Sequence, residues 1–475
     1  MLWPRRALYH DRLMVLSRRP LLGGVLGALV TTGQRAWAAP PIALTLAYER
    51  YRLPNGLEVI LHEDARTPVA AVNLWYHVGS KDEPQGKSGF AHLFEHLMFE
   101  GSRHVGEGMF LRYLDRIGAV DRNGTTNTDR TSYYETVPRG RLELALWLES
   151  DRMAFLLDRV DQASLDRQRE VVKNERRERY ENVPYGLVPQ FVRAALFPAD
   201  HPYHRLAIGT PEDLDRASLD DVKSFFRTFY GPNNATLVVA GAITPDLVKP
   251  LVSRYFGPIV APVTPPARVT PTVPTLTAEK RLALEADVEL PRLYLSWPTV
   301  PLFAPGDAEL DAAAKILSAG PGSRLQRRLI HDLGVAQHVG VQQASSQLAG
   351  VFEIVVTLRR GQDIAAVLGH VDTALDALRT QGPTEAEVQR AQARATTNLV
   401  LAAERTSGRA NALNLYNQFA GEPDYLATDL GRYRALTPAA VQRAVAAQLP
   451  AMGRLVTVVT PNPRAPRASA LRGKP

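Results

Sequence analysis

A proline-rich segment near the middle of the chain constrains the fold more than any other feature of this sequence. Six prolines punctuate a run of Val, Thr and Ala between Gly257 and Glu279. This composition favours an extended, semi-rigid connection. The segment therefore predicts a linker at residues 258–278 between two parts of about 200 residues each, which is an ordinary size for a domain.

The two parts end in a similar way. Residues 235–242 (ATLVVAGA) and 455–460 (LVTVVT) are short β-branched apolar runs, typical of buried strands that close a sheet. In the first part, residues 57–62 and 69–78 also predict strands, and helical spacing begins at Ser88. Strands ahead of long helices indicate an α+β fold with two homologous halves, at residues 39–257 and 279–475.

The first 38 residues have the three parts of a signal peptide. Two arginines precede an apolar stretch at residues 21–30, and residues 36–38 (AWA) supply an A-x-A cleavage site. Because the apolar stretch is short for a permanent span, we expect an exported, periplasmic chain that begins near Ala39 and has no stable membrane span. The pattern leaves open Sec or twin-arginine export, and retention of the signal as an anchor.

Charge and cysteine content narrow the class of protein. The net charge is +7 at pH 7, but the basic residues are spread along the chain, and at residues 175–181 (ERRERYE) they alternate with glutamates. This alternation is typical of a solvated helix face and argues against a nucleic-acid partner. The chain has no cysteine. Any transition-metal site must therefore use His and carboxylate ligands.

The segment at residues 92–96 (HLFEH) carries the strongest chemical signal. Apolar residues around it are spaced three and four apart, which predicts a helix with one buried face. On that helix His92 and His96 can direct two imidazoles at a single zinc ion, and Glu95 can reach a water molecule beside the metal. The order H-x-x-E-H is the inverted form of the commoner H-E-x-x-H zinc motif.

A catalytic zinc site needs a third protein ligand, which must be His, Asp or Glu in a chain without cysteine. Glu175 is a candidate on a predicted helix at residues 161–180. It follows Val171 and Val172, which we expect to turn this part of the helix inward. A carboxylate buried there would be costly without a cation beside it.

At these residues the sequence resembles the pitrilysin or insulinase-type (M16) zinc peptidases, which include the mitochondrial processing peptidase. Residues 89–101 (GFAHLFEHLMFEG) are similar to the family's catalytic helix, and residues 169–175 (REVVKNE) to the segment with its third zinc ligand. The resemblance implies that Glu175 completes the metal site of His92 and His96. It also implies two homologous halves, each an antiparallel sheet backed by helices, around a chamber for unfolded peptides.

The resemblance further implies a zinc-dependent endopeptidase without an organic cofactor. Zinc would activate water and polarise the scissile carbonyl, while Glu95 takes the proton of the water and passes it to the leaving amine. The peptide would bind as an added strand. Residues 123–134 (NGTTNTDRTSYY) are similar to the family's edge strand, which makes Asn127 and Thr128 candidates for contact with the peptide.

Two positions depart from the family's pattern. Members carry an Arg and a Tyr, seven residues apart, in the second half or in a partner subunit, and the matching positions here are Ile330 and Gln337. We therefore expect a heterodimer with a homologous subunit of similar size that supplies this pair. Gln168 stands where many relatives have Glu, one helical repeat before the third ligand.

Two other readings of the same motif remain. The chain could be a non-catalytic, peptide-binding subunit of a heterodimer, although the intact Glu95 argues against this, or a metal hydrolase that acts on a small molecule. Four further histidines have no partner at ligand spacing, and we expect surface or loop positions for them: His77, His104, His201 and His204.

Overall fold

The computed structural model describes residues 45–262, 267–268 and 270–471. The predicted signal peptide at residues 1–38 lies outside the described residues and stays a prediction, as do the exact ends of the linker. In the part of the chain that the structure describes, no helix has the length and apolar character needed to cross a bilayer.

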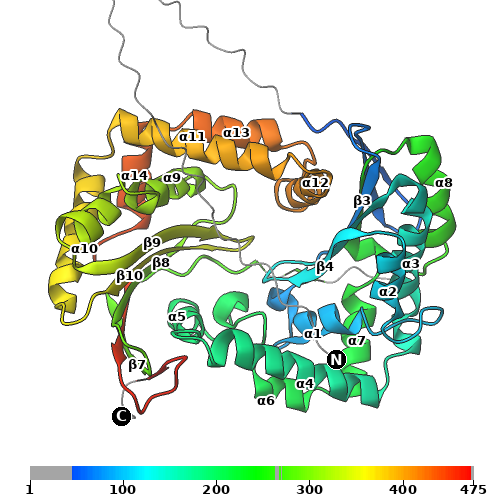
Figure 1. The fold of residues 1–475 in the computed structure, drawn as a ribbon, viewed down its shortest axis with the longest axis horizontal. Coiled ribbons are helices and arrows are strands. Elements are labelled where there is room, and N and C mark those ends of the chain that lie inside the picture. Colours follow the sequence, from blue (N-terminus) through cyan, green and yellow to red (C-terminus); the bar gives the residue numbers. More distant parts are fainter. Residues whose placement is uncertain (1–44, 263–266, 269, 472–475) are drawn as a thin grey trace, which may run out of the picture. The chain divides into compact units, whose positions relative to one another are not determined.

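The first half holds a sheet and the helices that cover it (Figure 1). Its strands are β1 (Glu49–Arg52), β2 (Glu58–Glu63), β3 (Val69–Tyr76), β4 (Val120–Thr126), β5 (Thr131–Pro138) and β6 (Ala235–Gly241). Its α-helices are α1 (Phe90–Leu97), α2 (Met109–Arg116), α3 (Leu142–Phe155), α4 (Gln162–Arg176), α5 (Val188–Leu196), α6 (Pro211–Arg216), α7 (Leu219–Phe229) and α8 (Pro245–Phe256). Short 3-10 turns include η1 (Ser80–Asp82) and η5 (Pro202–His204), and a π-helical turn, η4 (Arg177–Glu181), continues α4.

The second half repeats this plan. Its strands are β7 (Lys280–Ala286), β8 (Arg292–Thr299), β9 (Ala336–Ser345), β10 (Gly350–Leu358), β11 (Leu455–Pro461) and β12 (Ala470–Leu471). Its helices are α9 (Asp307–Ser318), the π-helical η7 (Gln326–Asp332), α10 (Ile364–Thr380), α11 (Glu385–Ala402), α12 (Thr406–Ala420), α13 (Leu426–Arg434) and α14 (Pro438–Gln448).

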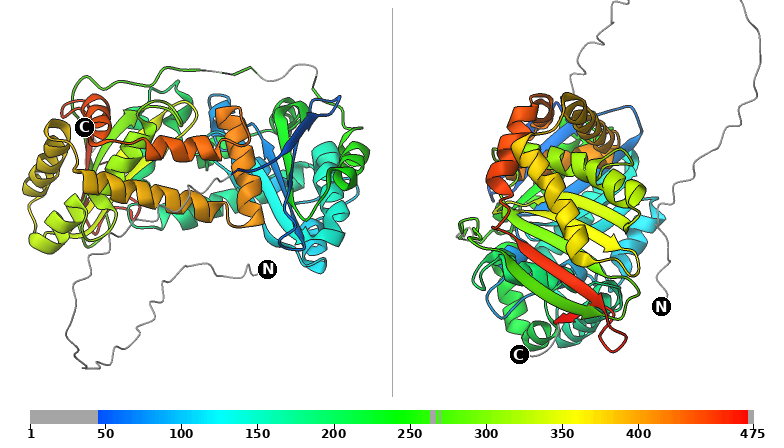
Figure 2. Two further views of the ribbon diagram at one scale, coloured as in Figure 1. Left: turned by 90° about the horizontal axis from the view of Figure 1, so that it is seen from above. Right: turned by 90° about the vertical axis from the view of Figure 1, so that its left-hand side faces the viewer.

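Five of the six strands follow the same topology in both sheets, which supports the expected duplication, whereas the outer strand is the first of its half in one sheet (β1) and the last in the other (β12). The first has the order β1-β2-β6-β3-β5-β4 and the second β12-β7-β11-β8-β10-β9. Each of the expected antiparallel sheets contains one parallel pair, since β2 pairs with β6, and β7 with β11, in parallel. Figure 2 shows the red strand β11 beside the green strand β7. The parallel pairs arise because the last long strand enters between two strands that run in opposite directions, so it must be parallel to one of them.

Each sheet is covered on one face by a helix from the other half. Val188, Val192 and Leu196 of α5 pack in a cluster with Leu284 and Leu455 of the second sheet. Helix α12 packs in the same way against β3 and β6 of the first sheet (Figure 1). Neither sheet can bury both of its faces with the helices of its own half, so we infer that the halves depend on each other for folding.

Because helices cover both faces of the first sheet, all residues of its strand β6 are buried. Leu237 and Val239 face the main core, whereas Val238 and Ala240 face the cluster with α12. The continuous apolar run in the sequence thus reflects a strand that is covered on both faces. The matching run of β11 is also mostly buried.

One expectation about α4 was wrong, and another held only in part, since Arg177, Glu178 and Arg179 are exposed but Arg176 is buried. Val171 is 43% exposed and only Val172 is buried, because neighbouring residues on a helix point about 100° apart. The basic run is not uniformly solvated either. Arg176 is 4% exposed, and its guanidinium donates to Gln190 Oε1 (2.7 Å), Glu181 Oε1 (2.8 Å) and the carbonyl of Gly209 (2.7 Å).

A buried carboxylate, Asp129, fastens the turn between β4 and β5 to the second half. Asp129 accepts hydrogen bonds from the Tyr203 hydroxyl (2.5 Å) and from the backbone N–H of Gln347 (3.0 Å), which lies in the turn between β9 and β10. The Tyr203 oxygen in turn accepts from the N–H of Leu348 (2.9 Å). The histidine-rich loop at residues 201–204 therefore has a structural task, since its tyrosine joins the two halves.

His77 and His201 lie in loops, as expected; His201 is buried and His77 is half-buried. His201 is 6% exposed, and its Nδ1 accepts from the backbone N–H of Tyr203. Both ring nitrogens of His77 are engaged, Nδ1 with Gln418 Oε1 (2.8 Å) and Nε2 with Thr236 Oγ1 (2.9 Å). His77 therefore links the end of β3 to α12.

We predict that His77 makes the fold sensitive to acid. Burial lowers the pKa of His77 to about 4, whereas in the unfolded chain it is about 6.5. Between these values the unfolded chain binds a proton that the folded chain does not, so stability falls as the pH decreases, by up to about 3 kcal/mol. The urea midpoint should therefore drop between pH 7 and pH 5 by more in the wild type than in His77→Gln. Equal drops would contradict this role.

Candidate metal centre

Helix α1 begins at a point where its free N–H groups are satisfied by a carboxyl group. Glu83 accepts from the N–H groups of Gly89 (3.0 Å) and Ala91 (2.9 Å), which have no partner within the helix. Burial raises the pKa of Glu83 to about 8, although these two hydrogen bonds oppose the shift. Gly89, with φ of 93°, adopts a left-handed conformation that disfavours side chains. The start of the helix is thus held in one place.

The apolar residues of α1 set the direction of its histidines. Phe90, Leu93, Phe94 and Leu97 are at most 1% exposed and pack into the core of the first half. The remaining face turns toward α4, which lies against α1. His92 and His96 occupy this face with ring centroids 4.8 Å apart.

The structure brings Glu175 of α4 to these two histidines. Glu175 Oε2 lies 3.1 Å from His96 Nε2 and 3.7 Å from His92 Nε2. One donor atom from each of the three residues lies within 4.8 Å of the other two. Among the described residues, no other group of three His, Cys, Asp or Glu side chains meets this condition.

The spacing of these donors fits a zinc ion. Tetrahedral zinc with bonds of about 2.0–2.2 Å to N and O separates its ligand atoms by about 3.3–3.6 Å, close to the two distances from Glu175 Oε2. Two imidazoles and one carboxylate are also a ligand set of catalytic zinc, with a position left for water. The residues present therefore fit the metal that the motif predicts.

The protonation states favour a cation at this point. Burial, together with the neighbouring His96, lowers the pKa of His92 to about 4, so its imidazole is neutral and can act as a ligand at neutral pH. Burial alone would raise the pKa of Glu175, but the hydrogen bond with His96 and the nearby imidazoles outweigh burial, and the pKa of Glu175 is lowered. Arg179 also contacts Glu175, at 2.7 Å.

Glu95 lies beside this cluster but is not one of its three donors. Burial raises the pKa of Glu95 above its usual value, although a hydrogen bond with Thr126 and the nearby His96 oppose the shift. Its Oε2 is buried and has no hydrogen-bond partner in the protein. A carboxylate with a raised pKa and a free oxygen is suited to exchange a proton with a water molecule at neutral pH.

Strand β4 passes very close to Glu95, and this approach requires glycine at position 124. A Cβ atom on Gly124 would lie 2.9 Å from Glu95 Cγ and 3.0 Å from the ring of Phe99. Because β4 is the outer strand of its sheet, one row of its backbone groups has no strand partner. The candidate metal centre therefore stands next to an open sheet edge.

The register shows which backbone groups of β4 are free. Asn127 N–H donates to Arg130 O (3.0 Å), so the pair of residues 127 and 130 is hydrogen-bonded. Hydrogen-bonded and non-bonded pairs alternate along antiparallel strands, and Thr125 lies opposite Ser132. We infer that Thr125 bonds to β5, and that Gly124 and Thr126 present their N–H and C=O groups to the open edge.

The expected edge strand at residues 123–134 is in fact a hairpin, and Asn127 and Thr128 lie in its turn. The Asn127 side-chain oxygen accepts from the N–H groups of Asp129 (2.8 Å) and Arg130 (2.9 Å). This local bonding closes the turn, as Asn side chains commonly do. Thr128 is only 7% exposed. The two residues are therefore near the open edge but not part of the strand that forms it.

The positions expected to lack the Arg and Tyr pair lie in the second half. Ile330 belongs to η7 and packs against the core of that half, and Gln337 is exposed on β9.

Gln168 donates from Nε2 to Glu100 Oε1 (2.7 Å). It thus supports the loop after α1. His104 bonds to Asp151 (2.5 Å), and His204 to the carbonyl of Phe197 (2.8 Å).

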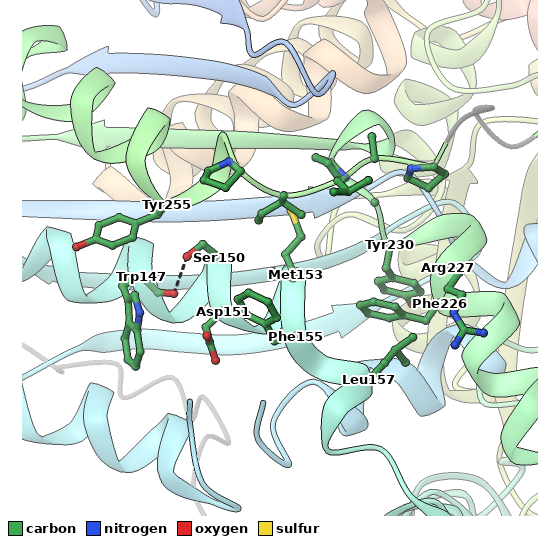
Figure 3. A pocket seen from close by; sticks show the side chains of 18 of the residues that line it. Trp147, Ser150, Asp151, Met153, Phe155, Leu157, Phe226, Arg227, Tyr230 and Tyr255 are labelled. Atoms are coloured by element: carbon green, nitrogen blue, oxygen red, sulfur yellow. Dashed lines mark hydrogen bonds between the residues drawn. The ribbon is translucent and has the colours of Figure 1, made fainter. Parts of the chain in front are cut away.

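A cavity of about 610 Å³ lies elsewhere in the first half, bordered by α3, α7 and residues 258–262 (Figure 3). Phe226 and Tyr230 stack within it, with ring centroids 5.4 Å apart, and Trp147 and Tyr255 lie toward its other end. None of its lining residues belongs to the metal cluster. This cavity is therefore separate from the candidate metal centre.

Sequence reasoning missed three residues that shape the site. Glu83 holds the start of α1, Gly124 allows β4 to approach, and Thr126 bonds to Glu95. Gly89 and Gly124 both lie in segments that the sequence singled out, at residues 89–101 and 123–134. Their partners were not, because each contact joins residues that are distant in the chain.

The chain matches two profiles of one protein family. The first, described as Insulinase (Peptidase family M16), covers residues 58–206. The second, described as Peptidase M16 inactive domain, covers residues 216–395. The first profile includes the described metal cluster, whereas the second includes Ile330 and Gln337.

Individual proteins give a consistent picture. The zinc protease PqqE of Helicobacter pylori is 29% identical over 419 residues, which cover 86% of this chain and 92% of that protein. A crystal structure of a protease from Helicobacter pylori matches with a TM-score of 0.81 and 25% identity, over 87% of this chain and all of that chain. The periplasmic protease PqqL from Escherichia coli shares the fold (TM-score 0.72, 18% identity), and this chain spans 48% of it.

The solved structures thus agree with the fold of two sheets and their helices, and the first profile spans the helix α1 that carries the motif. The two profiles belong to the same family; the second begins within the first half, at residue 216, and continues into the second half as far as residue 395. The chain belongs to the pitrilysin or insulinase-type family of peptidases, family M16.

Proposed function

We propose that this protein is a zinc-dependent endopeptidase that hydrolyses unfolded peptides. The observation that carries the proposal is the convergence of His92, His96 and Glu175 from two helices, with the unpartnered oxygen of Glu95 beside them. Relatives named zinc proteases support it. A protein that retained only the fold would not need this complete set of groups.

The residues would divide the chemistry as follows. His92, His96 and Glu175 hold the zinc ion, which when bound supplies Lewis acidity to a water molecule and to the scissile carbonyl. Glu95 accepts the proton from the water and delivers it to the nitrogen of the leaving amine. Glu83 keeps α1 in position, and Glu175 is steadied by Arg179.

The substrate would bind as an additional strand along β4. The free N–H and C=O groups of Gly124 and Thr126 provide main-chain hydrogen bonds, which any extended peptide can make. Because Gly124 has no side chain, the peptide backbone can lie beside Glu95. This mode of binding explains how one site could accept peptides of many sequences.

We further propose that the working enzyme is a heterodimer with a homologous subunit. Ile330 and Gln337 cannot provide the charge and the phenol that the family uses beside the cleaved bond. This chain spans 48% of PqqL, so PqqL is about twice as long, which supports a second unit of similar size.

We also propose export to the periplasm, on the signal-like pattern of residues 1–38. The alternative function is a non-catalytic peptide-binding subunit.

Metal removal tests the proposal. We expect about one zinc ion per purified mature chain, loss of peptide cleavage in the presence of a chelator, and recovery when zinc is added back. His96→Ala should lose most of the bound zinc, because two donors alone cannot hold it tightly. Cleavage of an unstructured peptide by metal-free protein would contradict the proposed function.

The proposed heterodimer is tested by adding the homologous subunit to the purified chain and measuring peptide cleavage. We expect the chain alone to cleave peptides weakly, and the addition of the homologous subunit to raise kcat. Ile330→Arg combined with Gln337→Tyr is the informative variant, because it restores the missing groups to this chain. Full activity of the purified wild-type chain as a monomer or homodimer would refute the heterodimer.

A further inference from the structure

Asparagine followed by glycine occurs twice in the sequence, at Asn55–Gly56 and at Asn123–Gly124. Asparagine is a thermolabile residue, because the backbone nitrogen of the next residue can attack its side-chain carbonyl carbon. Glycine in the next position favours this attack, since it has no side chain to block the approach and its backbone rotates freely. These two pairs are therefore the places in the chain where the reaction is chemically easiest.

The first pair is held by hydrogen bonds. The Asn55 side-chain amide donates to two backbone carbonyls of the segment after α8, at 2.7 and 3.0 Å, and its oxygen accepts from the N–H of Leu57 (3.2 Å). The N–H of Gly56 donates to the carbonyl of Leu53 (2.9 Å). Both reacting groups are occupied, so we expect this pair to be stable.

Both reacting groups of the second pair are free. The Asn123 side chain is exposed and has no hydrogen-bond partner in the part of the chain that the structure describes. Gly124 lies on β4, the outer strand of the first sheet (Figure 1). Because hydrogen-bonded and non-bonded pairs alternate along the hairpin of β4 and β5, the N–H of Gly124 points to the open edge. The attacking nitrogen and the amide that it would attack thus both lack a partner.

The backbone beside Asn123 is irregular. The register of β4 against β5 shifts between Val120 and Asn123, and Asp121 has a φ of 50°, which is uncommon for a residue other than glycine. Such a bulge disrupts the ladder locally, and poorly bonded strand ends open more readily than the centre of a sheet. The rotation that brings the Gly124 nitrogen to the Asn123 side chain therefore breaks few hydrogen bonds.

We propose that Asn123 is a site of spontaneous modification that limits the working life of the peptide-binding edge. The Gly124 backbone nitrogen loses its proton and bonds to the side-chain carbonyl carbon of Asn123, and the side-chain nitrogen leaves as ammonia. Water then opens the resulting five-membered imide at either of its two carbonyls, which gives aspartate or isoaspartate. No electrons are gained or lost, and the net change is hydrolysis of the side-chain amide by one water molecule.

The modification would alter β4 beside Glu95. Isoaspartate adds one carbon atom to the main chain before Gly124, so the N–H and C=O groups of Gly124 and Thr126 lose the spacing of an extended strand. Little room exists for a displaced backbone, since a Cβ atom on Gly124 would already lie 2.9 Å from Glu95 Cγ. We expect modified chains to bind and cleave peptides poorly. This consequence rests on the proposed function, because it requires the peptide to lie along β4.

A bound peptide would protect the site. In an added strand, a carbonyl of the peptide accepts from the N–H of Gly124 and keeps this part of β4 extended. The nitrogen is then unable to reach the side chain of Asn123. The modification therefore proceeds in empty enzyme, so the working life of the protein depends on the supply of peptide.

Mass spectrometry of the purified, zinc-loaded protein tests the modification independently of activity. During incubation in warm, mildly alkaline buffer, the proteolytic fragment that contains Asn123 should gain one mass unit and separate into an aspartate and an isoaspartate form. The fragment that contains Asn55 should stay unmodified, which makes it a matched control within the same chain. Modification of Asn123 no faster than that of Asn55 would overturn the proposal.

Asn123→Gln tests the consequence for activity. Glutamine keeps the amide, but attack on its longer side chain forms a six-membered ring and is slow, so this fragment should not gain mass. The cleavage rate of the wild type should fall in proportion to the modified fraction, whereas Asn123→Gln should keep its own starting rate over the same time. Equal losses in both proteins, or full activity of modified wild type, would refute the effect on the edge.

Protection is tested in zinc-loaded Glu95→Gln protein, which should bind peptides without rapid cleavage. An unstructured peptide at about ten times its Kd leaves about one tenth of the sites empty, so the gain in mass at Asn123 should slow about tenfold. An unchanged rate would show that the peptide does not cover Gly124, and protection would be ruled out. Modification of Asn123 in a wild type that cleaves no peptide before incubation would instead overturn the proposed peptidase activity.

Discussion

Glu95→Gln should reduce peptide cleavage by about 10²- to 10⁴-fold, the usual contribution of a general acid and base. The amide has nearly the same shape as the carboxylate but cannot accept a proton from water. Glu95 is not among the three clustered donors, so the zinc content should stay the same. Measurement of kcat/KM and of bound zinc on the same preparation checks both statements, and the loss corresponds to about 3–5 kcal/mol of barrier.

Glu178→Gln is a suitable control for this experiment. Glu178 lies on the turn after α4, near Glu175 in sequence, but it is exposed and is not part of the metal cluster. The same chemical change there should leave both rate and zinc unchanged. Unaltered cleavage by zinc-loaded Glu95→Gln would refute the assigned role. Loss of zinc would show that Glu95 contributes to the metal site itself.

Arg152→Met should destabilise the protein by about 3–5 kcal/mol, the cost of leaving a buried charge without its partner. Arg152 and Glu149 on α3 have side chains that are 1% and 0% exposed, and Arg152 Nε donates to Glu149 Oε2 (2.9 Å). The guanidinium also lies 4.1 Å from the centre of the Tyr133 ring. The midpoint of chemical denaturation measures the effect.

The double variant Arg152→Met with Glu149→Leu separates charge from packing. If the unpaired carboxylate causes the loss, the double variant should regain most of the stability, since apolar replacements of buried pairs are often neutral. Equal instability of both variants would mean that contacts of the Arg152 side chain with the rings matter more. Burial and the nearby Glu149 raise the pKa of Glu135 well above its usual value, so this second buried acid is protonated and does not need a second cation.

This cluster also reaches the candidate metal centre. The Tyr133 hydroxyl donates to the carbonyl of Phe94 on α1 (3.3 Å), and a buried tyrosine normally keeps such a partner. Zinc content should therefore be measured for the Arg152 variants as well. A shift in zinc affinity without global unfolding would place the cluster among the supports of α1.

The sequence by itself was sufficient for the local parts of the site. The three- and four-residue spacing at residues 90–98 predicted a helix, and α1 occupies Phe90–Leu97. The helix predicted at residues 161–180 corresponds to α4 (Gln162–Arg176) and the turn η4 that continues it. These predictions succeeded because helical hydrogen bonds and the positions of His92 and His96 on one face depend on neighbours within four residues.

Two predictions from the sequence were inaccurate in detail, one for residues 123–134 and one for the valines before Glu175. The β-branched and aromatic content of residues 123–134 suggested one strand, but Asn127 closes a turn within it through its own side chain. The two valines before Glu175 suggested a common inward direction, but only Val172 is buried. In both cases the composition predicted the type of secondary structure correctly. The hydrogen bonds of the Asn127 side chain determined where the strand ends, and the rotation between neighbouring helix residues determined which valine is buried.

What the sequence determined is thus the motif helix, the repeated strand pattern and, through the family resemblance, Glu175 as the companion of His92 and His96. Three features could be found only from the tertiary structure. Helix α5 covers the sheet of the second half and α12 covers that of the first. Asp129 bonds to the second half, and Gly124 lies against Glu95. The physical reason is distance along the chain. Contacts between residues separated by tens or hundreds of positions depend on how whole helices and strands pack. The spacing of apolar residues within one segment does not predict that packing.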